Sequence, residues 1–239
     1  MLELTEKRLV ALLWILKNKE KKWSVYELGK GAAKMLGIDH AIYTQKKPAP
    51  ITNIDSALAL TYRPTLTFVK ELEKNGFVAK DPKTNEYGVS RATDLVRLIS
   101  LARPVRSMKT IGYHSDLDFT KKLGLIDKAK IPYSFTVFAG SELYRQYVKT
   151  EEIHAYLKES DVGKWEKYLI SKKCLKAEKK QANLFLLPTK NPALFNASQK
   201  SRGFSVVPMP ILLADLLSYG GLAQEQGEFL LEQWVGNRL

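Results

Sequence analysis

The sequence predicts an α+β protein, and three observations lead to this fold class. Apolar residues at helical spacing dominate the first hundred residues, and a short hairpin pattern lies near their end. After Pro104 the apolar pattern changes, because short strand-like apolar runs alternate with helical ones. A chain of 239 residues is also long enough for two domains that each bury a core. We therefore expect one domain at residues 1–103 and a mixed α+β domain at residues 104–239.

The N-terminal domain begins with capped helices. Thr5 and Ser24 precede two apolar-periodic stretches, and each hydroxyl can accept from a free backbone amide of the first turn. Gly37 ends the second stretch, and the prolines of residues 45–50 favour a loop. The expected helices cover residues 6–16, 24–36, 53–60, 63–74 and 93–102.

A β-hairpin is expected after the helix at residues 63–74, which ends at Asn75 and Gly76. Two short apolar runs, at 77–80 and 86–89, flank a polar turn whose proline and asparagine favour chain reversal. Helices followed by a two-stranded hairpin are the element order of a winged helix-turn-helix domain.

The helix at residues 63–74 has a polar and an apolar face, given about 100° of rotation per residue. One narrow stripe collects Arg63, Thr67, Lys70 and Lys74, and the opposite side collects Phe68, Val69 and Leu72. A helix that docks in the major groove of DNA needs this division. The candidate DNA-contacting residues are Tyr62, Arg63, Thr65, Thr67, Lys70 and Lys74 on the helix and Lys80, Lys83, Thr84 and Asn85 on the wing. Among them, we expect base readout from the residues at 63, 65 and 67, and phosphate contacts from the lysines at 74, 80 and 83.

The charge of the chain favours a polyanionic partner. It has 38 Lys+Arg against 25 Asp+Glu, a net charge of +13. Residues 1–110 hold 20 basic and 11 acidic residues, a net +9, and the remainder holds 18 and 14, a net +4. Such an excess steers DNA and releases its counterions on binding, although a solvated lysine surface gives the same numbers.

Several classes of protein are excluded by composition. No run of 18 apolar residues is present and the N-terminus does not have the layout of a secretory signal, so we expect no membrane association. Cys174 is the only cysteine, which excludes an internal disulfide and suits the cytoplasm. With three scattered histidines, the chain predicts neither a metal cluster nor a cofactor. Lysines next to Cys174 could lower the pKa of its thiol.

The C-terminal domain contains signals that resemble those of an enzyme. We expect strands at 134–138, 152–157, 182–187 and 204–207, and helices through 143–147, at 211–217 and at 222–234, with one short helix within 104–132. Asp116 and Asp118 would share one side of a strand and could hold a divalent metal. A Gly140-Ser141 turn, followed by Glu152 and His154, has the spacing of a nucleotidyltransferase. However, the aspartates precede the turn, and magnesium prefers oxygen ligands to the imidazole of the later pair. We therefore expect no catalytic activity, while an active or degenerate nucleotidyltransferase stays an alternative.

The C-terminal residues carry a resemblance to a known family. The run from Val206 through Pro210 and Asp215 to Gly220-Gly221, continued by residues 222–230, resembles the closing segment of AbiEi-type antitoxins. These are the transcriptional regulators of type IV toxin–antitoxin systems, and residues 138–143 are similar to an upstream element of the family. Leu222 departs from the family pattern, in which arginine is common.

This resemblance implies a repressor that binds its own operator in double-stranded DNA and counteracts a nucleotidyltransferase-like toxin without a stable complex. If the protein forms a homodimer, half-sites about one helical turn apart are expected. A further alternative is a protein-interaction module. From Ser205 onward the chain has four acidic residues and one basic residue, Arg238, and this net charge of −3 would repel DNA.

Overall fold

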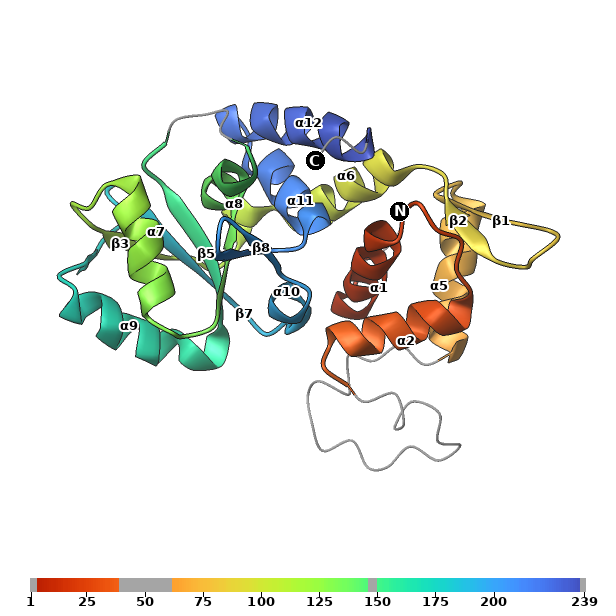
Figure 1. Ribbon diagram of the computed structural model, residues 1–239, viewed down its shortest axis with the longest axis horizontal. Coiled ribbons are helices and arrows are strands. Elements are labelled where there is room, and N and C mark those ends of the chain that lie inside the picture. The colour runs from red at the N-terminus through yellow and green to blue at the C-terminus, as the bar shows by residue number, and fades with distance from the viewer. Residues whose placement is uncertain (1–3, 39–61, 146–149, 237–239) are drawn as a thin grey trace. The chain divides into compact units, whose positions relative to one another are not determined.

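The computed structural model describes residues 4–38, 62–145 and 150–236, and Figure 1 shows its helices and strands. Within these residues the protein is α+β, which confirms the expected fold class. The chain divides into two compact units, Met1–Ala102 (unit 1) and Arg103–Leu239 (unit 2). Each unit has its own core and is described by itself.

Unit 1 has the element order of a winged helix-turn-helix domain. Its described helices and strands are α1 (Glu6–Lys17), α2 (Val25–Met35), α5 (Tyr62–Lys74), β1 (Val78–Lys80), β2 (Tyr87–Val89) and α6 (Ala92–Ala102). The strands β1 and β2 pair antiparallel and form the wing. The loop expected at 45–50 and the helix expected at 53–60 lie outside the described residues. Tyr62, one residue before the expected start of this helix, is the first residue of α5.

The two expected caps are present. The Thr5 side chain accepts from the Arg8 amide at 3.4 Å at the start of α1. Ser24 and Glu27 form a reciprocal capping box at the start of α2, in which each side chain accepts from the other residue's amide. This hydrogen bonding lowers the pKa of the Glu27 carboxyl. Local sequence therefore determines where both helices begin.

An aromatic cluster joins the wing to the helices of unit 1. Trp23 is buried, stacks on Tyr87 with ring centroids 5.5 Å apart, and meets the edge of Trp14 at 6.1 Å. The backbones of Trp23 and Tyr87 exchange two hydrogen bonds of 2.9 and 2.8 Å. The base of the wing is therefore held by the same core that holds the helices.

Unit 2 is built on a mixed sheet with strand order β6-β3-β7-β5-β4-β9-β8. Its strands are β3 (Ile111–His114), β4 (Tyr133–Thr136), β5 (Ile153–Lys158), β6 (Leu175–Lys176), β7 (Leu184–Thr189), β8 (Gln199–Ser201) and β9 (Phe204–Val206). The central pair β5 and β7 is parallel, as is β4 with β9, and the other pairs are antiparallel. In β5 and β7 nearly every residue is buried, as expected for strands covered on both faces.

Helices cover this sheet in two groups (Figure 1). Those of unit 2 are α7 (Phe119–Lys128), α8 (Val137–Tyr144), α9 (Val162–Ser171), α10 (Ala193–Asn196), α11 (Met209–Tyr219) and α12 (Leu222–Val235), with 3-10 turns η1 (Val105–Ser107) and η2 (Glu159–Asp161). One group is α8, α11 and α12, in which α11 packs on both other helices. The other is α7 and α9, joined by the Tyr168 hydroxyl, which donates to the Leu125 carbonyl at 2.8 Å.

Some expected boundaries in unit 2 are wrong. The strand expected at 134–138 ends at Thr136, because Val137 and Phe138 already belong to α8. Gly140 and Ser141 are therefore not a turn but two buried helical residues. The short strand β3 and the helix α9 were not expected at all. Tyr147, expected to extend the helix after Gly140, lies outside the described residues.

Candidate functional site

The polar stripe of α5 is exposed as the helical wheel predicts. Arg63, Thr67, Lys70 and Lys74 are all exposed. The side chains of Phe68, Val69 and Leu72 are buried against the core of unit 1. The α5 helix has 13 residues, which is about 20 Å of helix at 1.5 Å per residue. It thus offers a rigid face of hydrogen-bond donors with the dimensions of a major-groove reader.

Thr65 does not belong to this face. Its side chain is fully buried, at 0% exposure, so the expectation that it contacts a base edge is wrong. It lies three, four and seven residues before Phe68, Val69 and Leu72, and this spacing places it on the apolar side of the helix. Tyr62, by contrast, is 57% exposed at the first turn of α5.

The wing carries the remaining expected residues at its surface. Lys80, Lys83, Thr84 and Asn85 are exposed. Asp81 orders the turn, because its Oδ1 accepts from the backbone amides of Lys83 at 2.8 Å and Thr84 at 3.4 Å. A hydrogen bond from Lys22 and these amides lower the pKa of the Asp81 carboxyl. Asn85 has a φ of 59°, a left-handed conformation that asparagine tolerates better than most residues.

Two further basic residues, which the sequence did not single out, lie beside the N-terminal end of α5. A shallow groove of about 390 Å³ is lined by Lys7 and Arg8 of α1 together with Arg63 and Thr67 of α5. Arg8 donates to Glu71 at 3.0 Å and lies over the ring of Phe68 at 5.1 Å, so it fastens α1 to α5. Lys7 is exposed and adds a positive charge next to Arg63. The two helices are more than 40 residues apart in sequence, and periodicity within either one cannot reveal this proximity.

Net charge alone does not distinguish the units. Within the observed boundary, unit 1 has 17 basic and 11 acidic residues, a net +6, and unit 2 has 21 and 14, a net +7. The difference lies in the arrangement, since in unit 1 the stripe on α5 and the lysines of the wing belong to two adjacent elements, the helix and the hairpin of β1 and β2. This arrangement places exposed cations of both elements on neighbouring parts of the surface.

The nucleotidyltransferase-like residues of unit 2 do not form the arrangement that such chemistry needs. Asp118 caps α7, where it accepts from the Lys121 amide at 2.8 Å, and the Asp116 side chain is fully exposed beside His114. Neither lies on a strand. A Cβ on Gly140 would lie 2.7 Å from Leu212 Cδ1, so this glycine permits close packing of α8 on α11. No group of three or more potential metal ligands was found among the described residues.

The surroundings expected for Cys174 are corrected by burial. Cys174 is buried, and burial raises the pKa of its thiol instead of the neighbouring lysines lowering it. Of the residues in the acidic C-terminal helices, Leu213 and Leu230 are buried in the core.

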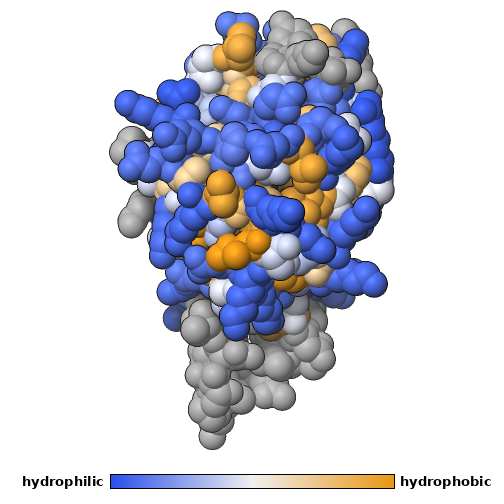
Figure 2. Space-filling model, turned by 90° about the vertical axis from the view of Figure 1, so that its left-hand side faces the viewer, coloured by the Kyte–Doolittle hydropathy of each residue, from blue (hydrophilic) through white to orange (hydrophobic). Residues whose placement is uncertain are grey.

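Figure 2 shows one face of the molecule, where hydrophilic side chains predominate and hydrophobic ones form separate small patches.

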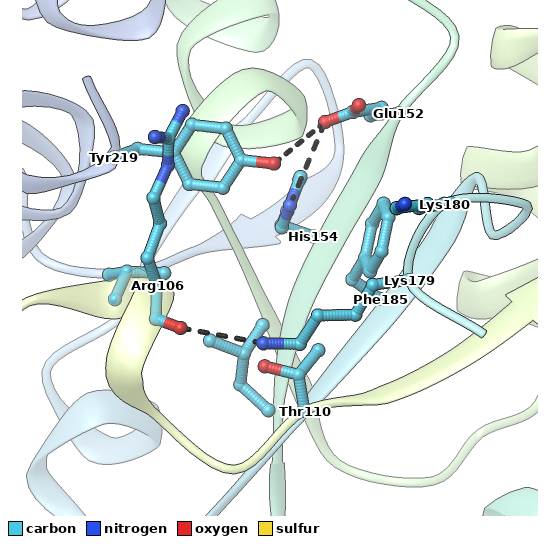
Figure 3. Close-up of a pocket in the computed structure, with 10 residues that line it drawn as sticks. Arg106, Thr110, Glu152, His154, Lys179, Lys180, Phe185 and Tyr219 are labelled. Atoms are coloured by element: carbon cyan, nitrogen blue, oxygen red, sulfur yellow. Dashed lines mark hydrogen bonds and ion pairs between the residues drawn. The ribbon is translucent and has the colours of Figure 1, made fainter.

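His154, which belongs to the strand expected at 152–157, lines a cavity of unit 2 together with Glu152 (Figure 3). Its side chain is 3% exposed and its Nε2 lies 3.9 Å from Glu152 Oε2, which is beyond hydrogen-bonding distance. Burial lowers the pKa of its imidazole to about 3, so the ring is neutral at pH 7.

No helix in the described part of the chain is long and apolar enough to cross a membrane. Comparison with protein-family models, with curated proteins and with solved structures gave no significant match.

Proposed function

We propose that this chain is a non-enzymatic, sequence-specific DNA-binding regulator of transcription that acts in the cytoplasm. The observation that carries the proposal is the exposed stripe of Arg63, Thr67, Lys70 and Lys74 on α5, followed by a wing with Lys80 and Lys83. A helix that buries one face and presents donors on the other, with a basic hairpin after it, is the working surface of winged-helix DNA readers.

Within this proposal, the residues divide into two roles. Arg63 and Thr67 are near the N-terminal end of α5, the end that a recognition helix presents to base edges, and Arg63 can bind guanine with two hydrogen bonds. Lys74, Lys80 and Lys83 bind phosphates, which positions the domain without reading sequence. Lys7 joins this second group, because it shares the groove of Arg63.

The experiment is a binding titration with fluorescently labelled duplexes of the protein's own upstream region and of scrambled sequence, from 50 to 300 mM salt. A regulator should prefer the upstream duplex by about a thousandfold or more. Equal affinity for the two duplexes at every salt concentration would contradict sequence-specific binding.

Arg63→Ala tests the readout role. We expect it to lose about 1–3 kcal/mol of discrimination between cognate and random duplexes. The matched control is Lys17→Ala, an exposed cation at the opposite end of α1 from the groove. If Arg63→Ala weakens both duplexes by the same factor, Arg63 binds phosphate and the readout assignment is wrong.

The resemblance to AbiEi-type antitoxins supports a narrower proposal, that the chain represses its own operon and counteracts a nucleotidyltransferase-like toxin. A reporter under the upstream region should be silenced by the wild-type chain and released by Arg63→Ala. Rescue of growth in cells that express such a toxin from a neighbouring gene tests whether the chain counteracts the toxin. Repression without rescue would leave a regulator that is not an antitoxin.

A further inference from the structure

A cavity in unit 2 has the properties of a small-molecule site and is separate from the proposed DNA surface. It opens beside η1, β5, β7 and the end of α11 and has a volume of about 560 Å³ (Figure 3). This volume lies within the range of about 300–1,000 Å³ that ligand pockets occupy.

The wall of the cavity is aromatic. The imidazole of His154 stacks on the ring of Phe185, with centroids 4.7 Å apart and an interplanar angle of 15°. Tyr219 meets the same imidazole edge-to-face at 5.0 Å. Figure 3 shows His154 between these two rings. Flat aromatic surfaces at right angles form a corner that suits a planar ring better than a branched aliphatic group.

The same wall contains polar groups without partners. His154 Nδ1 is buried and makes no hydrogen bond within the described residues, and Nε2 has only the 3.9 Å approach to Glu152. A neutral imidazole carries one donor and one acceptor; Nε2 lies on the side of Glu152, whereas the buried Nδ1 is closed to a ligand in the cavity. Glu152 accepts from the Tyr219 hydroxyl at 3.0 Å and has further acceptor capacity. His154 Nε2 and the remaining acceptor positions of Glu152 are therefore the polar groups of this wall that a ligand can meet.

The mouth of the cavity is positively charged. Arg106, Lys179 and Lys180 line it and are exposed, and Glu152 is the single acidic residue of the lining. The Arg106 guanidinium lies 4.9 Å from the centroid of the Tyr219 ring, and Lys179 donates to the Arg106 carbonyl at 3.4 Å. Figure 3 shows Arg106 beside Tyr219 and Lys180 beside Phe185, so cations flank the aromatic corner on two sides.

We propose that this cavity binds a nucleoside monophosphate whose base carries an exocyclic amino group, such as AMP or CMP. The base would lie against the aromatic wall that Tyr219, His154 and Phe185 form together, with its amino group donating to Glu152. The phosphate, which carries about 1.5–2 negative charges at pH 7, would be held by Arg106, Lys179 and Lys180. A carboxylate has half that charge and matches the three cations less well. This site goes beyond DNA binding and does not depend on it.

Isothermal titration calorimetry of the full chain with AMP, CMP, UMP and inorganic phosphate tests the proposal directly. We expect AMP or CMP to bind at least about tenfold more tightly than UMP, which lacks the amino group, and than phosphate, which lacks the ring. No heat from AMP or CMP at millimolar concentration would overturn the proposal. Phosphate that binds as tightly as the nucleotides would overturn the role of the aromatic corner.

Two variants locate the binding on the cavity. The double variant Lys179→Gln/Lys180→Gln should weaken nucleotide binding by about tenfold or more, because it removes two charge-assisted contacts. The matched control is Lys167→Gln, an exposed lysine of unit 2 that does not line the cavity. Equal losses in the double variant and the control would contradict binding at this site.

Histidine NMR supplies a second readout that does not depend on affinity. The chain has only three histidines, so the imidazole signals can be assigned by single substitutions. Saturating AMP or CMP should shift the His154 signals and leave those of His114 unchanged, since His114 lies outside the lining. Shifts at His114 alone would place the ligand elsewhere and overturn the assignment.

Discussion

The two units of this chain differ in where they keep their polar groups. Among the described residues, unit 1 buries two polar side chains, Thr65 and Ser100, whereas unit 2 buries eleven, including charged Lys122 and Asp215. In unit 1 the charged side chains of α5 lie at the surface over an apolar core. In unit 2 a mixed sheet and its helices enclose an imidazole and an ion pair.

The two candidate sites therefore have different physical origins, one local in sequence and one dependent on contacts between distant segments. The α5 surface follows from the period of one helix, so it tolerates many changes in the core beneath it. The unit 2 cavity depends on long-range packing, and its polar residues affect the stability of the unit as well as binding. Substitutions in each unit test this contrast.

The largest effect is expected at the buried ion pair. Asp215 Oδ1 lies 3.6 Å from Arg103, and its Oδ2 accepts from the Thr136 hydroxyl at 2.6 Å. Arg103→Met would leave this carboxylate without its cation, at an expected cost of about 3–5 kcal/mol at pH 7, measured by urea unfolding of the full chain. The double variant Arg103→Met/Asp215→Leu should recover most of the loss, because it removes the uncompensated charge.

The cost of Arg103→Met should also fall in acid. Burial raises the pKa of Asp215 to about 6 from its ordinary value of 3.8, so the stability that its protonated form contributes is fully present below pH 3.8 and is lost as the pH rises through 6. A loss that is the same at pH 5 and pH 8 would show that Asp215 is not the group left uncompensated.

A second effect concerns the buried imidazole. The pKa of His154 is lowered to about 3 from 6.5, so the stability it contributes is present above pH 6.5 and lost as the pH falls toward 3. His154→Phe removes this titration and both unpaired nitrogens. Between pH 6.5 and 4.5 the wild-type chain should lose about 1.4 kcal/mol per pH unit relative to the variant. Parallel stability curves for the two proteins would refute a buried neutral histidine.

A third effect tests the packing of unit 1. A Cβ on Gly31 would lie 1.6 Å from Nε1 of Trp14, so Gly31→Ala must displace the indole that contacts Trp23. We expect a loss of about 1–3 kcal/mol from overpacking, read from the urea midpoint. Gly88→Ala is the control, because a Cβ there meets nothing within 4 Å. If Gly31→Ala costs no more than Gly88→Ala, the Trp14 contact does not limit this position.

The smallest effect is expected at the wing. Lys83 is exposed and its side chain makes no hydrogen bond with the residues that the structure describes, so Lys83→Ala should leave stability unchanged. On DNA it should weaken cognate and random duplexes equally and reduce the slope of log affinity against log salt by about 1. A change in sequence preference would instead place Lys83 at a base edge.

The sequence predicted unit 1 better than unit 2, for physical reasons. Caps and helical periods are local, so Thr5, Ser24 and the α5 stripe could be placed from a few neighbouring residues. The error at Thr65 arose because we gave weight to its position near the helix start. Its spacing from Phe68, Val69 and Leu72 already placed it in the core.

In unit 2 the errors came from contacts between distant segments. Gly140 lies in a helix because α8 packs against Leu212, some 70 residues later, and no local signal shows this. The β3 strand is only four residues long and is defined by pairing with β6 and β7. The surroundings of His154 likewise come from Phe185 and Tyr219, so its unsatisfied nitrogens could not be predicted from the strand pattern.

The backbone bridge between Trp23 and Tyr87 has a consequence for amide hydrogen exchange. The two residues protect each other's N–H groups at the base of the wing, within the aromatic core of unit 1. Their hydrogens should therefore exchange with solvent only when the unit opens as a whole, at the slow rate of the core helices. The amide of Glu86, bonded to an exposed Thr84 hydroxyl at 3.4 Å, should exchange far sooner. The turn of the wing would thus exchange quickly and its base slowly. The turn could then change conformation without loosening the helix beside it.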